Sequence, residues 1–460
     1  MPIKALRLKA MQLKATRLKA KLLQARLLQA SALLGTSLNL VAMAAPYNAI
    51  NESIDDGFVE AGDILVIAIP ATGYLASWLY DDFEGAKQLT FSVLTTQLIV
   101  EATKSTVGRY RPNSNVAGGS YKSFPSGHSA GAFSGAAFLQ SRYGSRWGIP
   151  AYLGAGVVAA SRVHGRRHYA DDVLGGAGIA ILVNQYFVER YDNQGLAVSL
   201  FPNDEGGLQF NLSMPLDGPL NGRAGPRAEK RAQPAVHGPK RHRFAVNLGF
   251  NMTDSLGMAG AKDLLPDSQL VDDHQPFSYL LYEYLDSSKT SLQLELSPNE
   301  TRLFGTLSGE FELDGKQYQD GDSLYLAFKQ WSLGSQYFYR FAPQGDWHFK
   351  LGGGLYAYWV ELEVDYLTGG QYAGEGSLEV MPSIEGRTRY HIGGGLSADA
   401  MARFQAWSGN QLVAAEAGLS YALGEEWVMG LKYAYSEAKW DALNMEYQTD
   451  SIVLTVENRF

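Results

Sequence analysis

The stretch SFPSGHSA, residues 123–130, places a proline, a serine, a glycine and a histidine directly before a run of small residues. Pro125 and Ser126 are typical of the start of a helix, with Ser126 near the N-cap. The free N–H groups and the dipole of a helix N-terminus attract anions, and Gly127 lets an anion approach the backbone closely. The sequence therefore predicts an anion site at a helix start, with His128 in its first turn.

A stretch upstream of this helix start, KSTVGRYRP (residues 104–112), supplies two fixed cations. Lys104 ends a predicted helix over 86–104, and Arg111 follows in the loop before Pro112. An arginine offers a planar bidentate fork and a lysine offers a compact charge, so both suit a single anion. The pattern alone is weak, because basic residues before a proline are common in loops.

A stretch downstream, SRVHGRRHYADD (residues 161–172), adds Arg162, His168 and Asp172. His168 and Asp172 are four residues apart, so they share one face of a helix. A carboxylate in this position can accept the Nδ1 proton of the histidine and leave Nε2 free to attack. Such a pair alone is often an ordinary surface contact. Together, the three stretches supply what is needed to hold and attack a phosphate.

The three stretches resemble the signature of the type 2 phosphatidic acid phosphatase superfamily, which includes bacterial class A acid phosphatases and vanadium-dependent haloperoxidases. The signature is K-x6-RP, then PSGH, then SR-x5-H-x3-D, and this chain departs from it at no position. The match covers roughly residues 60–190. Asp171 also lies near His168, but the spacing of the family selects Asp172.

The resemblance implies an all-helical domain and a phosphomonoesterase mechanism without metal or cofactor, in which vanadate could act as a phosphate mimic. By that analogy His168 is the nucleophile that forms a phosphohistidine, and Asp172 orients it. His128 is the general acid for the leaving group and then the base for water. The phosphate would be held by Lys104, Arg111, Ser126, the Gly127 N–H and Arg162. We expect His164, Arg166 and Arg167, in the variable gap, to face solvent.

Composition restricts the alternatives. The chain has 460 residues, which favours two or more domains, and no cysteine, which excludes disulfides, thiolate zinc sites and a cysteine nucleophile. The net charge is −8, although residues 1–44 carry eight Lys or Arg and no acid. The remainder is therefore strongly acidic, which argues against nucleic-acid binding.

The N-terminal residues 1–44 resemble an export signal, with a basic region, a short apolar region and the small residues Ala42 and Ala44 at a cleavage site. The alternative is an amphipathic helix that stays at a membrane surface. Residues 45–199 are expected to form the helical catalytic domain. Its apolar segment 63–80 is long enough to span a membrane, but Pro70 and Gly73 favour a buried core helix or a broken pair.

The remaining residues form two segments. Residues 200–242 are rich in Pro, Gly and Arg without periodicity and are expected to be a linker. Residues 243–460 alternate apolar and polar side chains, as in VELEVDY (360–366) and WVMGLKYAY (427–435). The long strands, the aromatic residues and the terminal Phe460 predict an antiparallel barrel of about 10–12 strands, of the kind that spans bacterial outer membranes.

The sequence thus predicts an exported phosphatase whose helical domain lies on the periplasmic side of an outer-membrane barrel. Phospholipids there would supply the substrate, so we expect phosphatidic acid or a related lipid phosphate or diphosphate. One alternative is a vanadate-dependent haloperoxidase, because the same residues can bind vanadate. A second alternative is a non-enzymatic pore or binding barrel. We expect His348 and His391, on the predicted strands, to have structural roles.

Overall fold

The computed structural model describes residues 49–113, 120–191, 197–202, 208–213, 240–258, 264–265, 269–270 and 275–460. The predicted signal peptide, residues 1–44, lies outside the described residues, as does most of the predicted linker 200–242. In and beside that linker, β1 (Ala197–Pro202) and β2 (Leu208–Ser213) pair in antiparallel fashion, which the sequence pattern did not predict.

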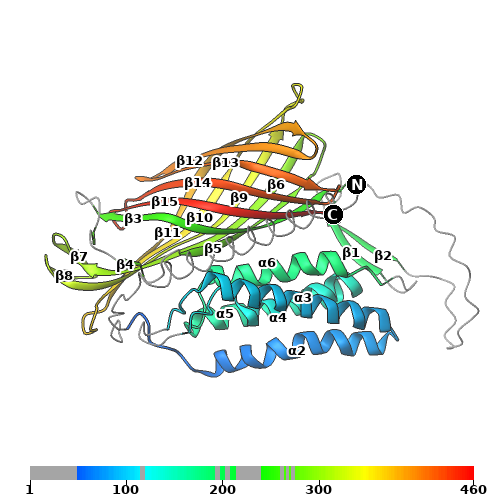
Figure 1. Ribbon diagram of the computed structural model, residues 1–460, viewed down its shortest axis with the longest axis horizontal. Helices are drawn as coiled ribbons and strands as arrows, with labels where there is room; N and C mark the ends of the chain where they lie inside the picture. Colours follow the sequence, from blue (N-terminus) through cyan, green and yellow to red (C-terminus); the bar gives the residue numbers. More distant parts are fainter. Residues whose placement is uncertain are drawn as a thin grey trace, which may run out of the picture. The chain divides into compact units, whose positions relative to one another are not determined.

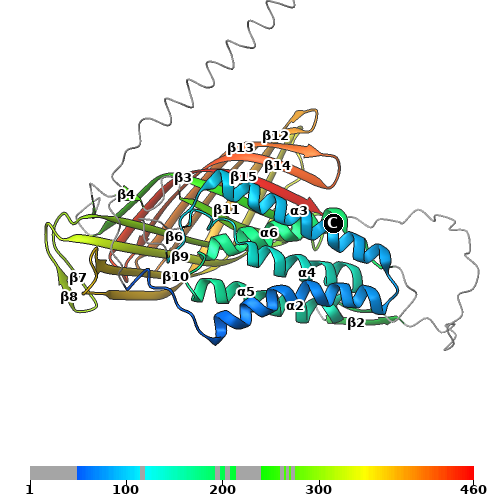
Figure 2. The same ribbon diagram turned by 60° about the horizontal axis from the view of Figure 1, so that its bottom comes forward.

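The described part of the N-terminal domain consists of helices, as predicted. Its five helices are α2 (Gly57–Leu79), α3 (Phe83–Val107), α4 (Gly127–Tyr143), α5 (Ser145–His164) and α6 (Ala170–Phe187). Helix α4 packs against the other four, and both views of the ribbon show it among them (Figures 1 and 2). Small residues allow this, because a Cβ at Gly135 of α4 would lie 2.7 Å from the backbone nitrogen of Pro70.

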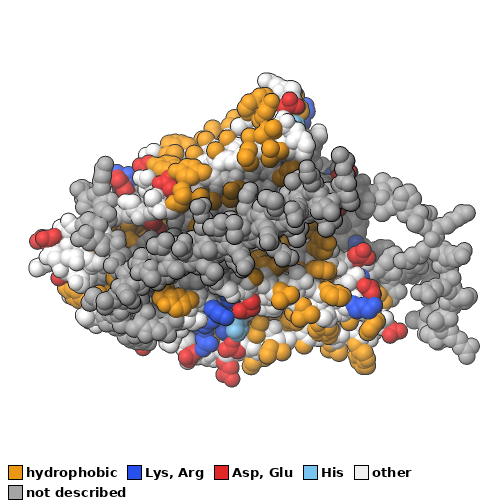
Figure 3. All heavy atoms as spheres, in the orientation of Figure 1, with side chains coloured by type: hydrophobic (Ala, Val, Ile, Leu, Met, Phe, Trp, Pro, Cys, Tyr) orange, Lys and Arg blue, Asp and Glu red, His pale blue; other side chains and the backbone are white. Residues whose placement is uncertain are grey.

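Helix α2 corrects the prediction for residues 63–80. It is a single helix that continues through Pro70, and only 22% of its most apolar 18-residue window is buried. Ile64, Ile67 and Trp78 are 61%, 72% and 77% exposed. Among the described residues, α2 is the helix long and apolar enough to cross a membrane. Figure 3 shows hydrophobic side chains over the region of α2. Hydropathy alone could not separate a core helix from one with an apolar outer face.

The C-terminal domain is a closed antiparallel barrel of ten strands, within the predicted range (Figure 1). Pairing of β6 with β9 closes it, and β4 (Gln269–Leu270) is an extra strand beside β6. In ring order the strands are β6 (Thr290–Thr306), β5 (Pro276–Tyr284), β3 (His242–Met258), β15 (Met445–Arg459), β14 (Trp427–Trp440), β13 (Asn410–Leu423), β12 (Leu396–Trp407), β11 (Ala373–Gly393), β10 (Trp347–Tyr366) and β9 (Ser323–Arg340). A separate hairpin pairs β7 (Phe311–Leu313) with β8 (Lys316–Tyr318).

The alternation along the strands sets the two faces of the barrel. Leu431 of β14 and Leu454 of β15 are 58% and 38% exposed, so these apolar residues face outward. In residues 360–366 of β10, the apolar side chains face inward instead. Val360 and Leu362 are buried in an apolar cluster with the inward-facing Trp440. The alternation of apolar and polar residues in the sequence showed which residues share a face of each strand, but not which face lies inside the barrel.

Helix α6 packs so closely against the N-terminus of α4 that a larger side chain at this contact should destabilise the helical domain. A Cβ at Gly176 would lie 2.3 Å from the carbonyl oxygen of Ser126, and backbone cannot yield as a side chain can. We predict that Gly176→Ala destabilises the helical domain by about 1–3 kcal/mol through overpacking. Thermal unfolding followed by far-UV circular dichroism measures this.

Gly156→Ala is the matched control, because Gly156 lies in α5 and a Cβ there would meet nothing within 4 Å. We expect this variant to be neutral or slightly stabilising, since alanine is the better helix former. Equal stability of the two variants would contradict the close helix crossing.

Candidate active site

The site begins where α4 and α6 are joined at their first turns. The backbone N–H of Ser126 donates to the carbonyl oxygen of Asp172 at 2.8 Å, and the Ser129 hydroxyl donates to the carbonyl of Val173 at 2.8 Å. Ser126 is the N-cap of α4, and its hydroxyl accepts from the Ser129 N–H at 3.4 Å. The PSGH stretch and the His-x3-Asp stretch therefore meet at one place.

His168 and Asp172 contact each other as predicted, but not from one face of a helix, because His168 lies before α6 and Asp172 in its first turn. Nδ1 of His168 lies 3.4 Å from Oδ2 of Asp172, and both side chains are buried. The same carboxylate oxygen accepts from the Tyr169 N–H at 2.9 Å and from the Ser123 hydroxyl at 2.5 Å. An acceptor fixed in this way holds the Nδ1 proton and directs Nε2 away from Asp172.

Arg109 is a functional candidate that the sequence analysis missed. Its Nη1 lies 2.8 Å from both the Asp171 and the Asp172 carboxylates, and its guanidinium covers the Tyr169 ring at 3.8 Å. Burial alone would raise the pKa of Asp172, but Arg109 and the hydrogen bond with His168 hold that pKa below its usual value. Arg109 occupies an unconstrained position of K-x6-RP, so the motif gave no signal for it.

Three cations converge on the helix start, as predicted. Lys104 is buried in the last turn of α3, and a Cβ at Gly127 would lie 3.1 Å from its Nζ. Arg162 is 1% exposed and donates to the Val59 carbonyl at 2.8 Å. Among the described residues, Nε of Arg111 is buried without a hydrogen-bond partner. Such an orphaned donor is typical of a site that an anion would complete.

His128 lies in the first turn of α4, and its Nε2 is 3.3 Å from Oδ1 of Asp63. The same Asp63 oxygen accepts from Arg162 at 2.7 Å, so one carboxylate of α2 contacts both a cation and the predicted acid. Partial burial and the nearby Arg162 lower the pKa of His128 to about 4. The imidazole of His128 is therefore neutral at neutral pH when no anion is bound. The sequence analysis did not single out Asp63, because it lies outside the three motifs.

Electrostatic interactions link these groups to one another. Burial lowers the pKa of His168; Asp172 opposes this shift, whereas Arg111 and Lys104 add to it. His168 and Arg111 also lower the pKa of His128. The structure thus brings together every predicted site residue, while their catalytic roles stay predictions: Lys104, Arg111, Ser126, Gly127, His128, Arg162, His168 and Asp172.

The gap residues lie at the edge of this cluster. His164 is 42% exposed and its Nε2 lies 2.8 Å from Oδ2 of Asp56, while Arg167 pairs with Asp55. Over the part of the chain that the structure describes, no group of three or more His, Asp or Glu side chains is arranged to hold a metal ion.

The fold and the site together define a helical domain of the phosphatase type followed by a closed β-barrel. Residues 85–195 match the family described as the PAP2 superfamily, so this segment is a PAP2 domain. This agrees with the resemblance that the three sequence stretches indicated.

Three similar proteins carry related descriptions. Over 119 residues the chain is 36% identical to the lipid A 1-phosphatase of Porphyromonas gingivalis, covering 24% of this chain and 26% of that protein. Over 169 residues it is 29% identical to the lipid A 4'-phosphatase of Helicobacter pylori, covering 35% and 84%. The crystal structure of Aquifex aeolicus LpxE matches with 23% identity and a TM-score of 0.23, covering 27% of this chain and 83% of that one. The chain thus spans about a quarter of the length of the first relative and most of the second.

Asp63 gives a prediction about the protonation of His128. Because the Asp63 carboxylate raises the pKa of His128 against the effect of Arg162, Asp63→Asn should move that pKa further below about 4. The chain has eight histidines, so NMR titration of imidazole-labelled protein is practicable, with His128→Gln to assign the signal.

Asp55→Asn is the control, since Asp55 is 67% exposed and pairs with Arg167 instead. The control should leave the His128 titration unchanged. An unchanged or higher pKa of His128 in Asp63→Asn would show that the Asp63 contact does not act on this imidazole.

Proposed function

We propose that this protein is a metal-independent phosphatase that hydrolyses lipid phosphate monoesters through a phosphohistidine intermediate. The observation that carries the proposal is the convergence of Lys104, Arg111 and Arg162 on a helix N-terminus that also presents His128 and the His168–Asp172 pair. Phosphoryl transfer depends mainly on positioning and on stabilising the charge of the phosphoryl oxygens, and this site supplies both.

In the first step, Nε2 of His168 attacks phosphorus while the three cations and the α4 N–H groups hold the phosphoryl oxygens. A P–N bond forms as the P–O bond to the alcohol breaks. Asp172 accepts a hydrogen bond from the Nδ1–H of His168, which keeps this proton, and stabilises the positive charge that develops on the ring. His128 donates a proton to the departing alkoxide, so the alcohol leaves neutral.

In the second step, a water molecule attacks the phosphohistidine. His128, now neutral, takes a proton from this water, the P–N bond breaks and inorganic phosphate is released. The low pKa of His128 without ligand keeps its imidazole deprotonated, as a group that accepts a proton must be. A bound phosphate dianion would raise that pKa, because negative charge favours the imidazolium, and would so prepare the acid for the first step.

The outer surface of α2 supports a lipid substrate. Asp63 of α2 contacts His128 and Arg162 in the site, whereas Ile64 and Ile67 of the same helix are 61% and 72% exposed. An acyl chain that lay along this apolar surface would bring its phosphate toward the catalytic cluster. The two curated relatives described above are named for phosphorylated lipids, which agrees with phosphatidic acid or a related lipid phosphate or diphosphate as substrate.

The barrel supports an outer-membrane location. Exposed apolar side chains cover its outer face, and closure of the sheet pairs its backbone groups, as a bilayer requires. With the catalytic domain N-terminal to the barrel, we place that domain in the periplasm. Phospholipids of the inner leaflet would then lie within reach.

His168→Ala tests the catalytic proposal. Because it removes the nucleophile, we expect kcat/KM for both phosphatidic acid and p-nitrophenyl phosphate to fall by about 10⁴-fold or more. The measurement is phosphate release by the purified full chain in the presence of a chelator. His164→Ala is the matched control, because His164 is half exposed and pairs with Asp56 outside the cluster.

Two outcomes would overturn the catalytic proposal. Full phosphatase activity in His168→Ala would show that His168 is not the nucleophile, and a wild type that releases no phosphate would favour a non-enzymatic barrel. Bromide oxidation that depends on vanadate and peroxide, without phosphate release by the wild type, would show a haloperoxidase instead.

The lipid part of the proposal is tested separately on α2. Ile64→Asn with Ile67→Asn removes exposed apolar side chains, so the KM for phosphatidic acid in vesicles should rise by about five-fold or more. Hydrolysis of p-nitrophenyl phosphate should not change. Leu378→Ser, at a 64% exposed position of β11, controls for loss of apolar surface on the barrel. Equal effects of the α2 variant on both substrates would exclude a lipid-binding role for this face.

A further inference from the structure

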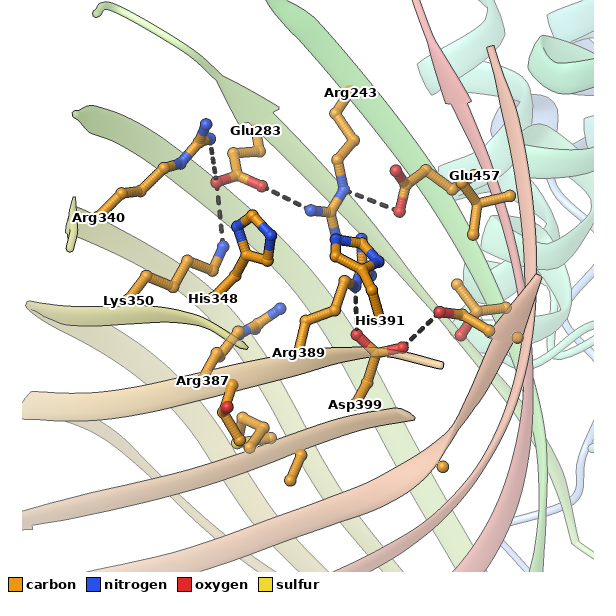
Figure 4. A pocket seen from close by; sticks show the side chains of 18 of the residues that line it. Arg243, Glu283, Arg340, His348, Lys350, Arg387, Arg389, His391, Asp399 and Glu457 are labelled. Atoms are coloured by element: carbon orange, nitrogen blue, oxygen red, sulfur yellow. Dashed lines mark hydrogen bonds and ion pairs between the residues drawn. The ribbon is translucent and has the colours of Figure 1, made fainter. Parts of the chain in front are cut away.

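The barrel contains a cavity of about 860 Å³ at the end where β3 begins at His242 and β15 ends at Arg459. No residue of the catalytic cluster lines it. We call this cavity the basic vestibule, and the close-up shows charged side chains from several strands around it (Figure 4). Its lining includes Arg243, Arg340, His348, Lys350, Arg387 and His391.

Cations outnumber carboxylates in the lining of the vestibule. Eight Lys or Arg side chains face five Asp or Glu side chains, and three histidines add further N–H donors. Glu283 illustrates the imbalance, since this fully buried carboxylate contacts Arg243 at 3.0 Å, Arg340 at 3.3 Å and Lys350 at 3.0 Å. Glu457 pairs with Arg243 at 2.9 Å and with Arg459 at 2.8 Å, so two carboxylates face four cations at this place, and this excess of positive charge favours an anion.

Two imidazoles lie among these cations. His348 of β10 and His391 of β11 meet edge to face with ring centroids 4.6 Å apart. Nδ1 of His391 lies 2.9 Å from the Ser397 hydroxyl, which leaves its Nε2 for another partner. Figure 4 shows both histidines among the labelled arginines and carboxylates of the lining. Arginine forks and imidazole N–H groups at one place are well suited to the oxygens of a phosphate.

The lumen beyond the vestibule is crossed by side chains. Arg403 of β12 donates to Glu295 of β6 at 2.9 and 2.7 Å and to Glu385 of β11 at 2.7 Å. Since β12 and β6 lie on opposite sides of the ring, this ion pair bridges the lumen. Farther along, Tyr356 and Trp440 belong to a buried apolar cluster. The charged cavity therefore lies on one side of this bridge, which favours a binding site over a passage for ions.

We propose that the basic vestibule binds a water-soluble phosphate anion, either inorganic phosphate or a phosphorylated sugar. The cavity is much larger than one phosphate, so it has room for an attached sugar. The excess of charged side chains in its lining favours a charged ligand over an acyl chain. The proposal does not depend on hydrolysis by the helical domain, because the two sites share no residue.

Isothermal titration calorimetry on the folded full chain in detergent tests the proposal with inorganic phosphate, glucose 1-phosphate and glucose. All titrations use an Arg162→Gln background, which removes a phosphate ligand of the catalytic cluster. We expect at least one phosphate compound to bind and glucose not to bind. Preference for inorganic phosphate or for glucose 1-phosphate identifies the source.

Lys350→Gln with His391→Gln should weaken phosphate binding by about ten-fold or more, because two ligating cations or donors are lost. Glu283 keeps Arg243 and Arg340 in this variant, so its buried charge stays paired. His348→Gln is a second, milder variant that should also weaken binding. The matched control Lys439→Gln removes a 56% exposed lysine of β14 that pairs with Glu446 outside the vestibule.

Absence of phosphate binding in the Arg162→Gln background would overturn the proposal. Binding that persists unchanged in both vestibule variants, or that glucose matches, would overturn it as well. Far-UV circular dichroism and the resistance of the barrel to detergent at room temperature confirm that each variant is folded.

Discussion

The active site depends on how closely α6 approaches the first turn of α4. The Ser126 N–H bonds to the carbonyl of Asp172, and only a glycine at position 176 leaves room for the Ser126 carbonyl. This crossing sets the distance between two helix starts. One start carries His128 and the anion-binding backbone, and the other follows the buried His168 and carries Asp172. Without the crossing, the three sequence stretches would form separate features of a helical domain.

A second constraint is electrostatic. Lys104, Arg111 and Arg162 repel one another, and this repulsion is reduced by the Asp63 carboxylate, which pairs with Arg162, and by the buried Asp172 carboxylate, which Arg109 holds in place. Both histidines have lowered pKa values, so the cluster avoids further positive charge when it is empty. A bound phosphate would supply the missing negative charge. The same arrangement thus limits the electrostatic repulsion in the empty site and favours the binding of phosphate.

The two domains use apolar side chains in opposite ways. In the barrel, the outward face is apolar and the inward face carries both polar and charged side chains, while Val360 and Leu362 of β10 belong to an inner apolar cluster. In the helical domain, α2 has an apolar outer surface and still sends Asp63 into the catalytic cluster. One helix therefore connects a surface suited to lipid with the groups that would act on its phosphate.

The sequence by itself determined the helical domain, the barrel and the eight site residues, because motif spacing and the period of two are local properties of the chain. Arg109 and Asp63 could not be found in this way, since each acts through a contact with residues distant in sequence. The exposure of α2 and the inward face of β10 were also decided by tertiary structure, because hydropathy measures how apolar a segment is and not what lies against it. The basic vestibule was likewise decided by tertiary structure, because its cations come from strands that only barrel closure brings together.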